Sequence, residues 1–552
     1  MRTAHTTLLT AMILGGLLVG ALPAAAADDV VVNGSGWGHG VGLSQYGAKG
    51  QADEGRTAEQ ILTHYFQGTS VVDIGTAISG SWVLSEPEPV WVNLLQGRAS
   101  LNVKAVGSGL LICQNEPSDL LLKQGDHSSY VILLESQLVS TGHFAGTPDT
   151  IFDNVTKSAV KAFQTDNGLA ADGIVGSQTR SSLWPLDKDG ENCLVQTPLP
   201  DGVELTITAN SVDGTCSVAS AIAAASCVAS VRGLTPTSRV ALSGKTYDAK
   251  TQEFAHGTFR MRPKSPGSIH AVLQVGIEDY IAGIAEVPAS WPVASLEAQA
   301  IAARSYGVDK VLARGPQPGF SSTVRSNCWC HLYSTTASQV YSGWNREVHF
   351  GGRWNTYARG TAGKVLTHPT RSIVPTFYSS STGGNTDTNE NAWGSTPLPY
   401  LRSVPDPWSL DPSINPNASW VKTLSSESAA AKLGFSSINR IFVTETNTTG
   451  TVKTVSISGV KGGTITTTNI SGGSFASKLG LKSRYFTVDW NGPPPVISGA
   501  DQPVLHDPTT GKWLYRSPNG DVSSIYFGDP GDFGFFGDWD CDGVDTPGLY
   551  RR

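Results

Sequence analysis

The sequence predicts an α+β protein: a mixed module of strands and helices, an inserted three-helix bundle, and a small β appendage at the C-terminal end. Strand-type runs, typical of sheets, occur at residues 90–106, 202–210 and 240–261. Between the first two runs, apolar residues at helical spacing predict helices at 129–140, 154–167 and 176–183. An alanine-rich stretch after Pro292 predicts a long helix, because alanine is the best helix former and proline is accepted at the first helical position.

Length and composition limit the class of protein. A chain of 552 residues is too long for one hydrophobic core, and we expect about three to four domains. A net charge of −7 with 15% charged residues gives no basic surface for nucleic acid. The 61 glycines and 31 prolines favour a loop-rich exported protein. The 14 tryptophans suit a carbohydrate-binding face, although tryptophan is also a common core residue.

The first 27 residues have the features of a signal peptide. Arg2 supplies the positive charge, Leu8–Leu22 an apolar segment, and the alanines after Pro23 a cleavage site near Ala26 or Ala27. An uncleaved anchor is the alternative, which the short apolar segment disfavours. Because no later stretch is long and apolar enough to span a bilayer, we expect a secreted protein.

The cysteines of an exported chain are expected to be mostly paired. Cys216 and Cys227 bracket an alanine-rich loop and suit a local disulfide. Cys113 and Cys193 flank the predicted bundle and would join the two ends of the insertion, which requires those ends to lie within about 7 Å. Cys328, Cys330 and Cys541 remain, and the odd total of seven leaves at least one cysteine unpaired.

A glycine-rich segment, residues 33–47, opens the mature chain. Its six glycines allow the backbone to approach a ligand closely. The side chains between them are suited to stacking on sugars and hydrogen-bonding to them: Trp37, His39, Ser44, Gln45 and Tyr46. A glycine-rich structural turn is the alternative. A helix is expected at about Thr57–Phe66.

One carboxylate lies in an otherwise apolar segment near the middle of the chain. Asp279–Val287 predicts a short helix that Pro288 ends, and the alanine-rich helix runs to about Ala313. Glu286 has apolar neighbours, so its pKa is expected to rise toward the range that is useful for proton donation. Arg304, on the alanine-rich helix, is long enough to reach that carboxylate or a bound anion. The alternative is a solvated Glu286 and a surface ion pair of Arg304.

Two further clusters carry polar side chains. A predicted strand ends at Tyr378, and small hydroxyl groups and glycines suited to holding glycan oxygens follow it, with a tyrosine further on: Ser379, Ser381, Thr382, Gly383, Gly384 and Tyr400. A plain serine–glycine turn is the alternative. Cys328, Cys330 and His331 suggest zinc, but C-x-C-H is too compact for the usual zinc spacing. A disulfide or core packing is therefore favoured.

The tail, residues 501–552, follows a Pro- and Gly-containing linker at 489–500 and predicts a β unit. Asp538, Asp540 and Asp542 place oxygens at alternating positions of a tight turn, which is typical of calcium ligands. Leu549 stands where an EF-hand would have its distal glutamate, so the expected calcium site is of another type.

Several of these stretches resemble one family. Glu286-Val-Pro288 followed by L-x-A-Q-A-x-A-A-R-S-Y at 296–306, W-G-H-G-x-G-x-S-Q-Y-G-A at 37–48, and the F-Y-S-S-S-T-G-G run at 377–384 resemble the motifs of SpoIID/LytB cell-wall proteins. The order is permuted, since the W-G-H-G motif commonly lies near the C-terminal end of that module. Such a permutation is tolerable if the segment packs against the same cleft.

The two flanking elements have resemblances of their own. A-V-x-x-F-Q-x-x-x-G-L-x-x-D-G-x-V-G-x-x-T at 159–179 resembles the three-helix peptidoglycan-binding domain, with a non-binding spacer as the alternative. The tail resembles one FG-GAP-like repeat. The expected domains are a signal peptide (1–27), the N-terminal part of the SpoIID/LytB-like module (28–113), the bundle (114–192), the main module (193–488), a linker (489–500) and the β repeat (501–552).

The resemblance implies a secreted, extracellular or wall-associated lytic transglycosylase that cleaves the β-1,4 bond between N-acetylmuramic acid and N-acetylglucosamine. Glu286 would be its single general acid and base, and Arg304 would orient that carboxylate or bind substrate. The glycine-rich and hydroxyl-rich segments would hold the sugars. No cofactor is implied; some members of the family carry a metal near the 328–331 loop. A non-catalytic glycan-binding enhancer of a separate amidase is the alternative.

Overall fold

The computed structural model describes residues 29–115, 121–184, 193–211, 215–218, 222–226, 229–316, 320–490, 504–516, 522–529, 531–537 and 546–550. The chain contains both helices and strands, grouped in separate runs such as α5–α7 and β7–β15, which confirms the α+β class. The chain divides into two compact units, Ser35–Ser419 and a second unit built from Met1–Gly34 with Trp420–Arg552. No helix among the described residues is long and apolar enough to cross a bilayer.

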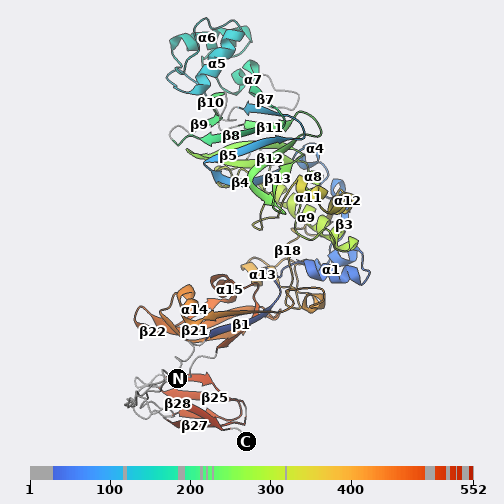
Figure 1. Ribbon diagram of the computed structural model, residues 1–552, viewed down its shortest axis with the longest axis vertical. Helices are drawn as coiled ribbons and strands as arrows, with labels where there is room; N and C mark the ends of the chain where they lie inside the picture. Colours follow the sequence, from blue (N-terminus) through green and yellow to red (C-terminus); the bar gives the residue numbers. More distant parts are fainter. Residues whose placement is uncertain are drawn as a thin grey trace, which may run out of the picture. The chain divides into compact units, whose positions relative to one another are not determined.

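Two sheets form the centre of the larger unit (Figure 1). The first has the order β16-β4-β15-β14-β11-β6-β7, and only its β16–β4 pair is parallel. Its strands are β4 Val90–Arg98, β6 Leu110–Asn115, β7 Cys193–Leu199, β11 Ala229–Gly233, β14 Thr258–Ser265, β15 Ser268–Val275 and β16 Leu332–Tyr333. The second, β10-β9-β8-β5-β12-β13, contains β5 Ser100–Val106, β8 Glu204–Ala209, β9 Thr215–Val218, β10 Ile222–Ser226, β12 Arg239–Tyr247 and β13 Lys250–Phe254.

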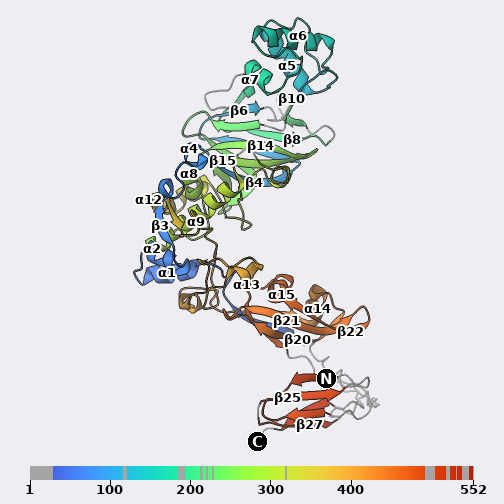
Figure 2. The same cartoon turned by 180° about the vertical axis from the view of Figure 1, so that it is seen from behind.

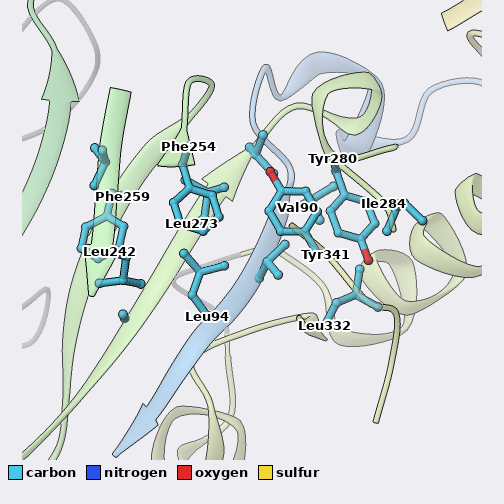
Figure 3. Packing of buried hydrophobic residues seen from close by; sticks show 14 of the residues in the cluster. Val90, Leu94, Leu242, Phe254, Phe259, Leu273, Tyr280, Ile284, Leu332 and Tyr341 are labelled. Atoms are coloured by element: carbon cyan, nitrogen blue, oxygen red, sulfur yellow. The ribbon is translucent and has the colours of Figure 1, made fainter. Parts of the chain in front are cut away.

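The hydrophobic core of the two sheets extends to the segment that carries Glu286. Leu94, Leu242 and Leu273 from three strands belong to the same buried cluster as Tyr280 and Tyr341 (Figure 3). The ring of Tyr341 stacks on Tyr280 at 5.2 Å and on Phe254 of β13 at 6.1 Å. Aromatic packing of this kind adds to simple burial, so the sheet supports the site directly.

The alanine-rich helix α9, Val293–Arg314, is buried on most of its surface, as a helix inside a core must be. One face, with Leu296 and Ala300, packs on the sheet core. Another, with Ala298 and Ala302, packs on the helices α1 Gln45–Asp53 and α2 Ala58–Tyr65. Small side chains let helices approach closely, which explains the alanine content. Two smaller helices lie beside it (Figure 2), α8 Ile277–Ala282 and α12 Arg353–Gly360. The helices α11 Trp344–Val348 and η1 His349–Gly352 directly precede α12 in the chain.

The predicted helix at 279–287 is shorter than expected. Helix α8 ends at Ala282, and Gly283 follows as its C-cap, with its N–H bonded to the carbonyls of Asp279 and Tyr280. A side chain at Gly283 would begin 2.4 Å from the Tyr341 ring. The chain then becomes extended, because Ile284 pairs with Tyr341 as an antiparallel bridge. Glu286 therefore lies in a bend after this bridge rather than on a helix.

The glycine-rich and hydroxyl-rich segments lie side by side despite their separation in sequence. Strand β2, Leu43–Ser44, pairs in parallel with β18, Tyr378–Ser379. Bridges also join Trp37 to Ser381 and Val41 to Asp387. Nearby elements are β3 Ser70–Asp73, α3 Ile74–Ala77, α4 Trp82–Ser85, α10 Ser322–Asn327, β17 Lys364–Thr367, α13 Asn389–Trp393 and η2 Pro407–Leu410.

The inserted bundle has the predicted helices, with ends that differ by no more than one residue: α5 Ser129–Ser140, α6 Asn154–Asp166 and α7 Ser177–Leu183. It connects β6 to β7, and these strands are antiparallel neighbours in which Asn115 lies opposite Cys193. The insertion into a β layer is thereby confirmed. Leu134, Val160 and Phe163 form its core, whereas Val155, expected on the same face, is 59% exposed.

The second unit has its own core. Strand β1, Asp29–Ser35, pairs with β19, Trp420–Ser425, and with β23, Tyr485–Trp490. The segment 420–488, expected to close the main module, therefore packs with the N-terminal strand instead. Its other elements are α14 Ser426–Leu433, β20 Ser437–Thr446, β21 Val452–Lys461, β22 Thr464–Ser471 and α15 Gly472–Leu479.

The tail forms strands, as the sequence predicts. They are β24 Val504–Asp507, β25 Lys512–Arg516, β26 Val522–Tyr526, β27 Phe533–Gly537 and β28 Thr546–Tyr550. The expected calcium ligands Asp538, Asp540 and Asp542 and the expected signal peptide lie outside the described residues. The FG-GAP-like repeat and the calcium site stay predictions.

Cys328 and Cys330 form a disulfide. Beside them, His331 accepts a hydrogen bond at Nδ1 from the Trp91 N–H and donates from Nε2 to the Gly315 carbonyl. Burial lowers the pKa of His331 to about 4, so the ring is neutral. The Cys328–Cys330 disulfide and the neutral His331 are thus held within the folded structure. Cys113 and Cys216 are also disulfide-bonded. The side chain of Cys193, and all of Cys227 and Cys541, lie outside the described residues, so these pairings stay predictions.

Candidate active site around Glu286

Hydrogen bonds to the segment around Val340 hold the segment that carries Glu286 in place. The Ala285 N–H donates to the Val340 carbonyl at 2.8 Å. The Val340 N–H donates in return to Glu286 Oε1 at 2.6 Å. The carboxyl group is thus held by a main-chain donor, which has little freedom to move.

Two arginines hold the main chain on both sides of Glu286. Arg346, which is buried, donates to the carbonyls of Ile284 and Val287 at 3.0 and 2.7 Å. Arg353 donates to the carbonyls of Ala289 and Trp291, both at 3.0 Å. Rigid guanidinium groups are well suited to binding two acceptors at once. Neither arginine was identified from the sequence, because each lies some sixty residues away from the carbonyls that it binds.

A chain of hydrogen bonds connects helix α8 to the carboxyl group. Tyr280 donates from its hydroxyl to Gln339 Oε1 at 2.7 Å, Gln339 Nε2 donates to the Tyr378 hydroxyl at 2.9 Å, and Tyr378 donates to Glu286 Oε1 at 3.3 Å. Gln339 is fully buried and also donates to the Ala303 carbonyl of α9. Buried networks of this kind fix one geometry when every member is bonded.

Burial raises the pKa of Glu286, and the hydrogen bonds from Val340 and Tyr378 oppose that rise only in part. The expectation drawn from its apolar neighbours is confirmed. Burial also raises the pKa of Tyr280, Tyr306 and Tyr378, so these hydroxyl groups stay neutral and offer the carboxylate no charge. Both of these hydrogen bonds end on Oε1 and not on Oε2.

A cavity of about 460 Å³ opens beside Glu286. It is lined by Ala285, Glu286, Val287, Pro288, Ala289, Ser290, Tyr247, Arg346, His349 and Phe350. Among these lining residues Glu286 is the only carboxylate. Aromatic side chains with a few polar groups are typical of small-ligand sites.

Arg304 has a different partner from the predicted one. Its side chain is completely buried, and its Nε and Nη2 donate to the two oxygens of Glu278 at 2.8 and 2.6 Å. The remaining N–H groups donate to Thr361 Oγ1 and to the carbonyls of Lys364 and Ala358. All five donors are used, so Arg304 neither reaches Glu286 nor is available to an anion.

Most of the hydroxyl and amide groups expected to hold sugars are used inside the protein. Ser381 Oγ accepts from the Trp37 N–H, and Ser379 Oγ accepts from the Gly40 N–H. Thr382 Oγ1 donates to Asp406. Six of the predicted groups are less than 9% exposed: Ser44, Gln45, Ser379, Ser381, Thr382 and Tyr400. Their burial differs from the expectation of sugar-binding side chains, and Ser379 and Ser381 instead connect the two adjoining loops.

Some residues of the same loops do remain at the surface. Trp37 is 52% exposed, and His39, Tyr46, Gly383 and Gly384 are partly exposed. The Tyr46 ring lies 4.9 Å from that of Trp291, at the end of the Glu286 segment.

A row of aromatic rings connects His39 to the site. Its ring lies 5.2 Å from Trp393 and 6.5 Å from Phe377, and Phe377 lies 5.9 Å from Tyr306, beside Tyr378. Neither His39 nor Ser381 lines the cavity at Glu286. Tyr378, which bonds Glu286, nevertheless comes from the strand that pairs with the glycine-rich segment.

Two segments match known families. Residues 265–368 match the family described as Stage II sporulation protein, and residues 127–183 match the family described as Putative peptidoglycan binding domain. The first match contains Glu286, the two arginines and Gln339. The second coincides with helices α5–α7.

Individual relatives agree with these matches. The chain is 31% identical over 232 residues to Stage II sporulation protein D of Bacillus amyloliquefaciens, which covers 41% of this chain and 63% of that protein. It is 34% identical over 149 residues to the amidase enhancer of Bacillus subtilis (strain 168), which covers 27% of this chain and 17% of that protein.

The chain thus spans less than two thirds of each of these relatives. Among solved structures, the SleB N-terminal domain is 32% identical over 12% of this chain and 89% of its own length, with a TM-score of 0.12. The family matches and the curated relatives together support a cell-wall-related function. The chain carries a stage II sporulation protein domain, which contains Glu286, and an inserted peptidoglycan-binding domain.

Proposed function

We propose that the protein is a secreted or wall-associated lytic transglycosylase that cleaves the β-1,4 bond between N-acetylmuramic acid and N-acetylglucosamine in peptidoglycan. The observation that carries the proposal is Glu286, a carboxyl group whose pKa is raised by burial and which is the only carboxylate among the described residues that line its cavity. The inserted bundle supports a glycan as the ligand, since residues 127–183 match a peptidoglycan-binding family.

A single carboxylate favours this reaction over ordinary hydrolysis. Hydrolytic glycosidases generally use two carboxyl groups, about 5 to 9.5 Å apart, because one must activate water or form a covalent intermediate. A lytic enzyme needs only one, since the C6 hydroxyl of the muramic residue attacks its own C1. The cavity at Glu286 offers one acid and no partner for it.

The reaction balances on this one group. The proton on Glu286 Oε2 passes to the glycosidic oxygen as the bond from that oxygen to C1 breaks. The resulting carboxylate then accepts the proton of the C6 hydroxyl while the bond from C1 to O6 forms. The products are a 1,6-anhydromuramic end and a free hydroxyl on the glucosamine, and no water is consumed. Glu286 regains its proton and is ready for another turnover.

The neighbouring residues position this carboxyl group. Val340 and Tyr378 occupy Oε1, so the reactive proton is directed to Oε2. Arg346 and Arg353 fix the main chain on either side. Such positioning is worth several kcal/mol of barrier lowering.

Glu286→Gln tests the proposal, because it keeps the shape of the side chain and removes the acid. It should abolish anhydro products from peptide-free glycan strands while leaving the melting temperature at or above that of the wild type. Glu297→Gln is a matched control: burial also raises the pKa of Glu297, but this residue does not line the cavity. Retained cleavage by Glu286→Gln, or equal loss in the control, would refute the assignment.

A second candidate function is a non-catalytic enhancer of a cell-wall amidase, which the similarity to the amidase enhancer of Bacillus subtilis favours. Binding and cleavage would use the same cavity. The two are separated by adding a purified amidase to sacculi with and without the protein. Faster peptide release, together with glycan strands that the protein alone leaves uncut, would support the enhancer and exclude the transglycosylase.

A further inference from the structure

An exposed aromatic residue stands at the rim of the Glu286 cavity. Phe350 is 62% exposed, lines the cavity, and has a left-handed backbone with φ of 53° and ψ of 44°. Gly351 and Gly352 continue this conformation, with φ of 66° and 74°. Left-handed backbone is unfavourable for a residue with a side chain, and an exposed ring recovers little from burial. Strain that persists at the edge of a cavity suggests a functional reason.

The backbone around Phe350 is tied to the segment that carries Glu286. Arg346 and Arg353 stand on either side of it in the chain and bond to carbonyls of residues 284–291. Asn345 connects the same region to β13 through hydrogen bonds with Glu253 and Thr251. The position of Phe350 relative to Glu286 is therefore set by the folded protein.

Two further rings complete this side of the cavity. The His349 ring lies 5.5 Å from that of Tyr247 and 6.4 Å from that of Phe350. The Tyr247 hydroxyl accepts a hydrogen bond from Arg346. The lining of the cavity therefore combines three rings, those of Tyr247, His349 and Phe350, with the carboxyl group of Glu286.

A sugar ring matches this combination of groups. Its axial C–H groups make an apolar face, and its hydroxyl and acetamido groups make a polar edge. Aromatic side chains bury such apolar faces at little cost in side-chain entropy.

We propose that Phe350, with Tyr247 and His349, forms a sugar subsite next to Glu286 and stacks on the apolar face of an N-acetylated hexosamine of the glycan strand. The inference rests on the proposed function in one respect, that the ligand is glycan. It assigns Phe350 a role in substrate affinity and none in proton transfer.

Phe350→Gly provides a test in which stability and binding change in opposite directions. Glycine removes the ring and suits the left-handed backbone, so the melting temperature should stay the same or rise. Binding of a muramic acid–glucosamine tetrasaccharide should weaken by about fivefold or more. The measurement uses full-length Glu286→Gln protein, in which the probe is not cleaved. Phe350→Trp should preserve binding.

The binding site must be reported locally, because the inserted bundle is itself a candidate glycan binder. Hydrogen exchange of residues 284–291 and 345–353 supplies this readout. The tetrasaccharide should slow exchange there in the Glu286→Gln protein and not after the added Phe350→Gly substitution. Val348→Ala is the matched control, since Val348 is 48% exposed but does not line the cavity.

The possible outcomes test the sugar subsite and the transglycosylase reaction independently. Local protection that is unchanged by Phe350→Gly, or absent in the Glu286→Gln protein, would overturn the subsite. Loss of protection with Phe350→Gly, in a protein whose wild type forms no anhydro ends, would keep the subsite and overturn the transglycosylase. Where the wild type does cleave, Phe350→Gly should raise KM more than it lowers kcat.

Discussion

At the scale of single residues, burial suits Glu286 to its proposed role as a proton donor and also makes its charged form unfavourable for stability. A carboxyl group whose folded-state pKa is raised binds its proton more tightly in the folded than in the unfolded protein. The stabilisation from this difference is fully present below the unfolded pKa of about 4.5 and is lost as the pH rises through the folded pKa. At neutral pH the folded protein must hold a desolvated charge.

Replacing that charge should therefore stabilise the protein, with a sign that depends on pH. Glu286→Gln is expected to melt at a higher temperature than the wild type at about pH 7, and at about the same temperature at about pH 4. Circular dichroism melts across the pH range measure this. A variant that is less stable than the wild type at neutral pH would show that the carboxylate stabilises the fold.

Arg304 differs from Glu286, because its charge stabilises the fold through bonds inside the protein. Its five donors all bond inside the protein, and its partner Glu278 is about a third exposed. Breaking a buried pair from one side costs about 3 kcal/mol, and the partial exposure of Glu278 reduces this.

We expect Arg304→Ala to lose roughly 2 kcal/mol in urea unfolding, with Arg304→Lys intermediate because lysine keeps the charge but not the planar fork. Below the melting temperature, the folded fraction should keep its kcat. Unchanged stability together with lost turnover would instead return Arg304 to the catalytic machinery.

At the scale of elements, a histidine links a β turn to two helices. His256 lies between β13 and β14 and donates from Nε2 to the buried Glu347 of α11 at 2.9 Å. Asp279 of α8 lies 3.9 Å away and is paired with Arg359 of α12. The hydrogen bond to Glu347 raises the pKa of His256, although burial opposes the rise.

This raised pKa predicts a loss of stability above neutral pH. The contribution of His256 is fully present below its unfolded pKa of about 6.5 and is lost as the pH rises through the higher folded value. The wild type should thus lose melting temperature as the pH rises above about 6.5, and His256→Gln should reduce that slope. An identical slope in the variant would mean that other groups produce it.

The elements also show what sequence patterns could predict. The long helix at 293–314 and the three bundle helices follow local periodicity, and their boundaries agree with the prediction. The raised pKa of Glu286 followed from adjacent residues. The roles of Ser379 and Ser381 could not be predicted, because both residues pair with residues some 340 positions earlier. The early end of α8 likewise depends on contact between Gly283 and the distant Tyr341.

At the scale of the whole molecule, wall binding and cleavage are assigned to separate parts of the chain. The bundle enters and leaves between adjacent antiparallel strands, β6 and β7. Its removal should therefore leave a simple hairpin. The two compact units were not predictable in the same way, since residues 420–488 find their partner strand at 29–34.

Replacing residues 116–192 by an Asn-Gly turn, which suits a two-residue hairpin, should preserve the fold of the remaining protein. Pull-down on purified sacculi should fall several-fold, while cleavage of soluble glycan strands stays close to that of the full chain. If both forms sediment equally with sacculi, the bundle is a spacer and wall binding belongs to another surface.

The most direct test of the central claim is mass spectrometry of peptide-free glycan strands that the wild-type protein has digested in water labelled with heavy oxygen. Attack by the C6 hydroxyl consumes no water, so the new ends should be lighter by one water than reducing ends and should carry no label. Labelled reducing ends would contradict the account, because they would show that water attacks at C1 and that Glu286 belongs to a hydrolase.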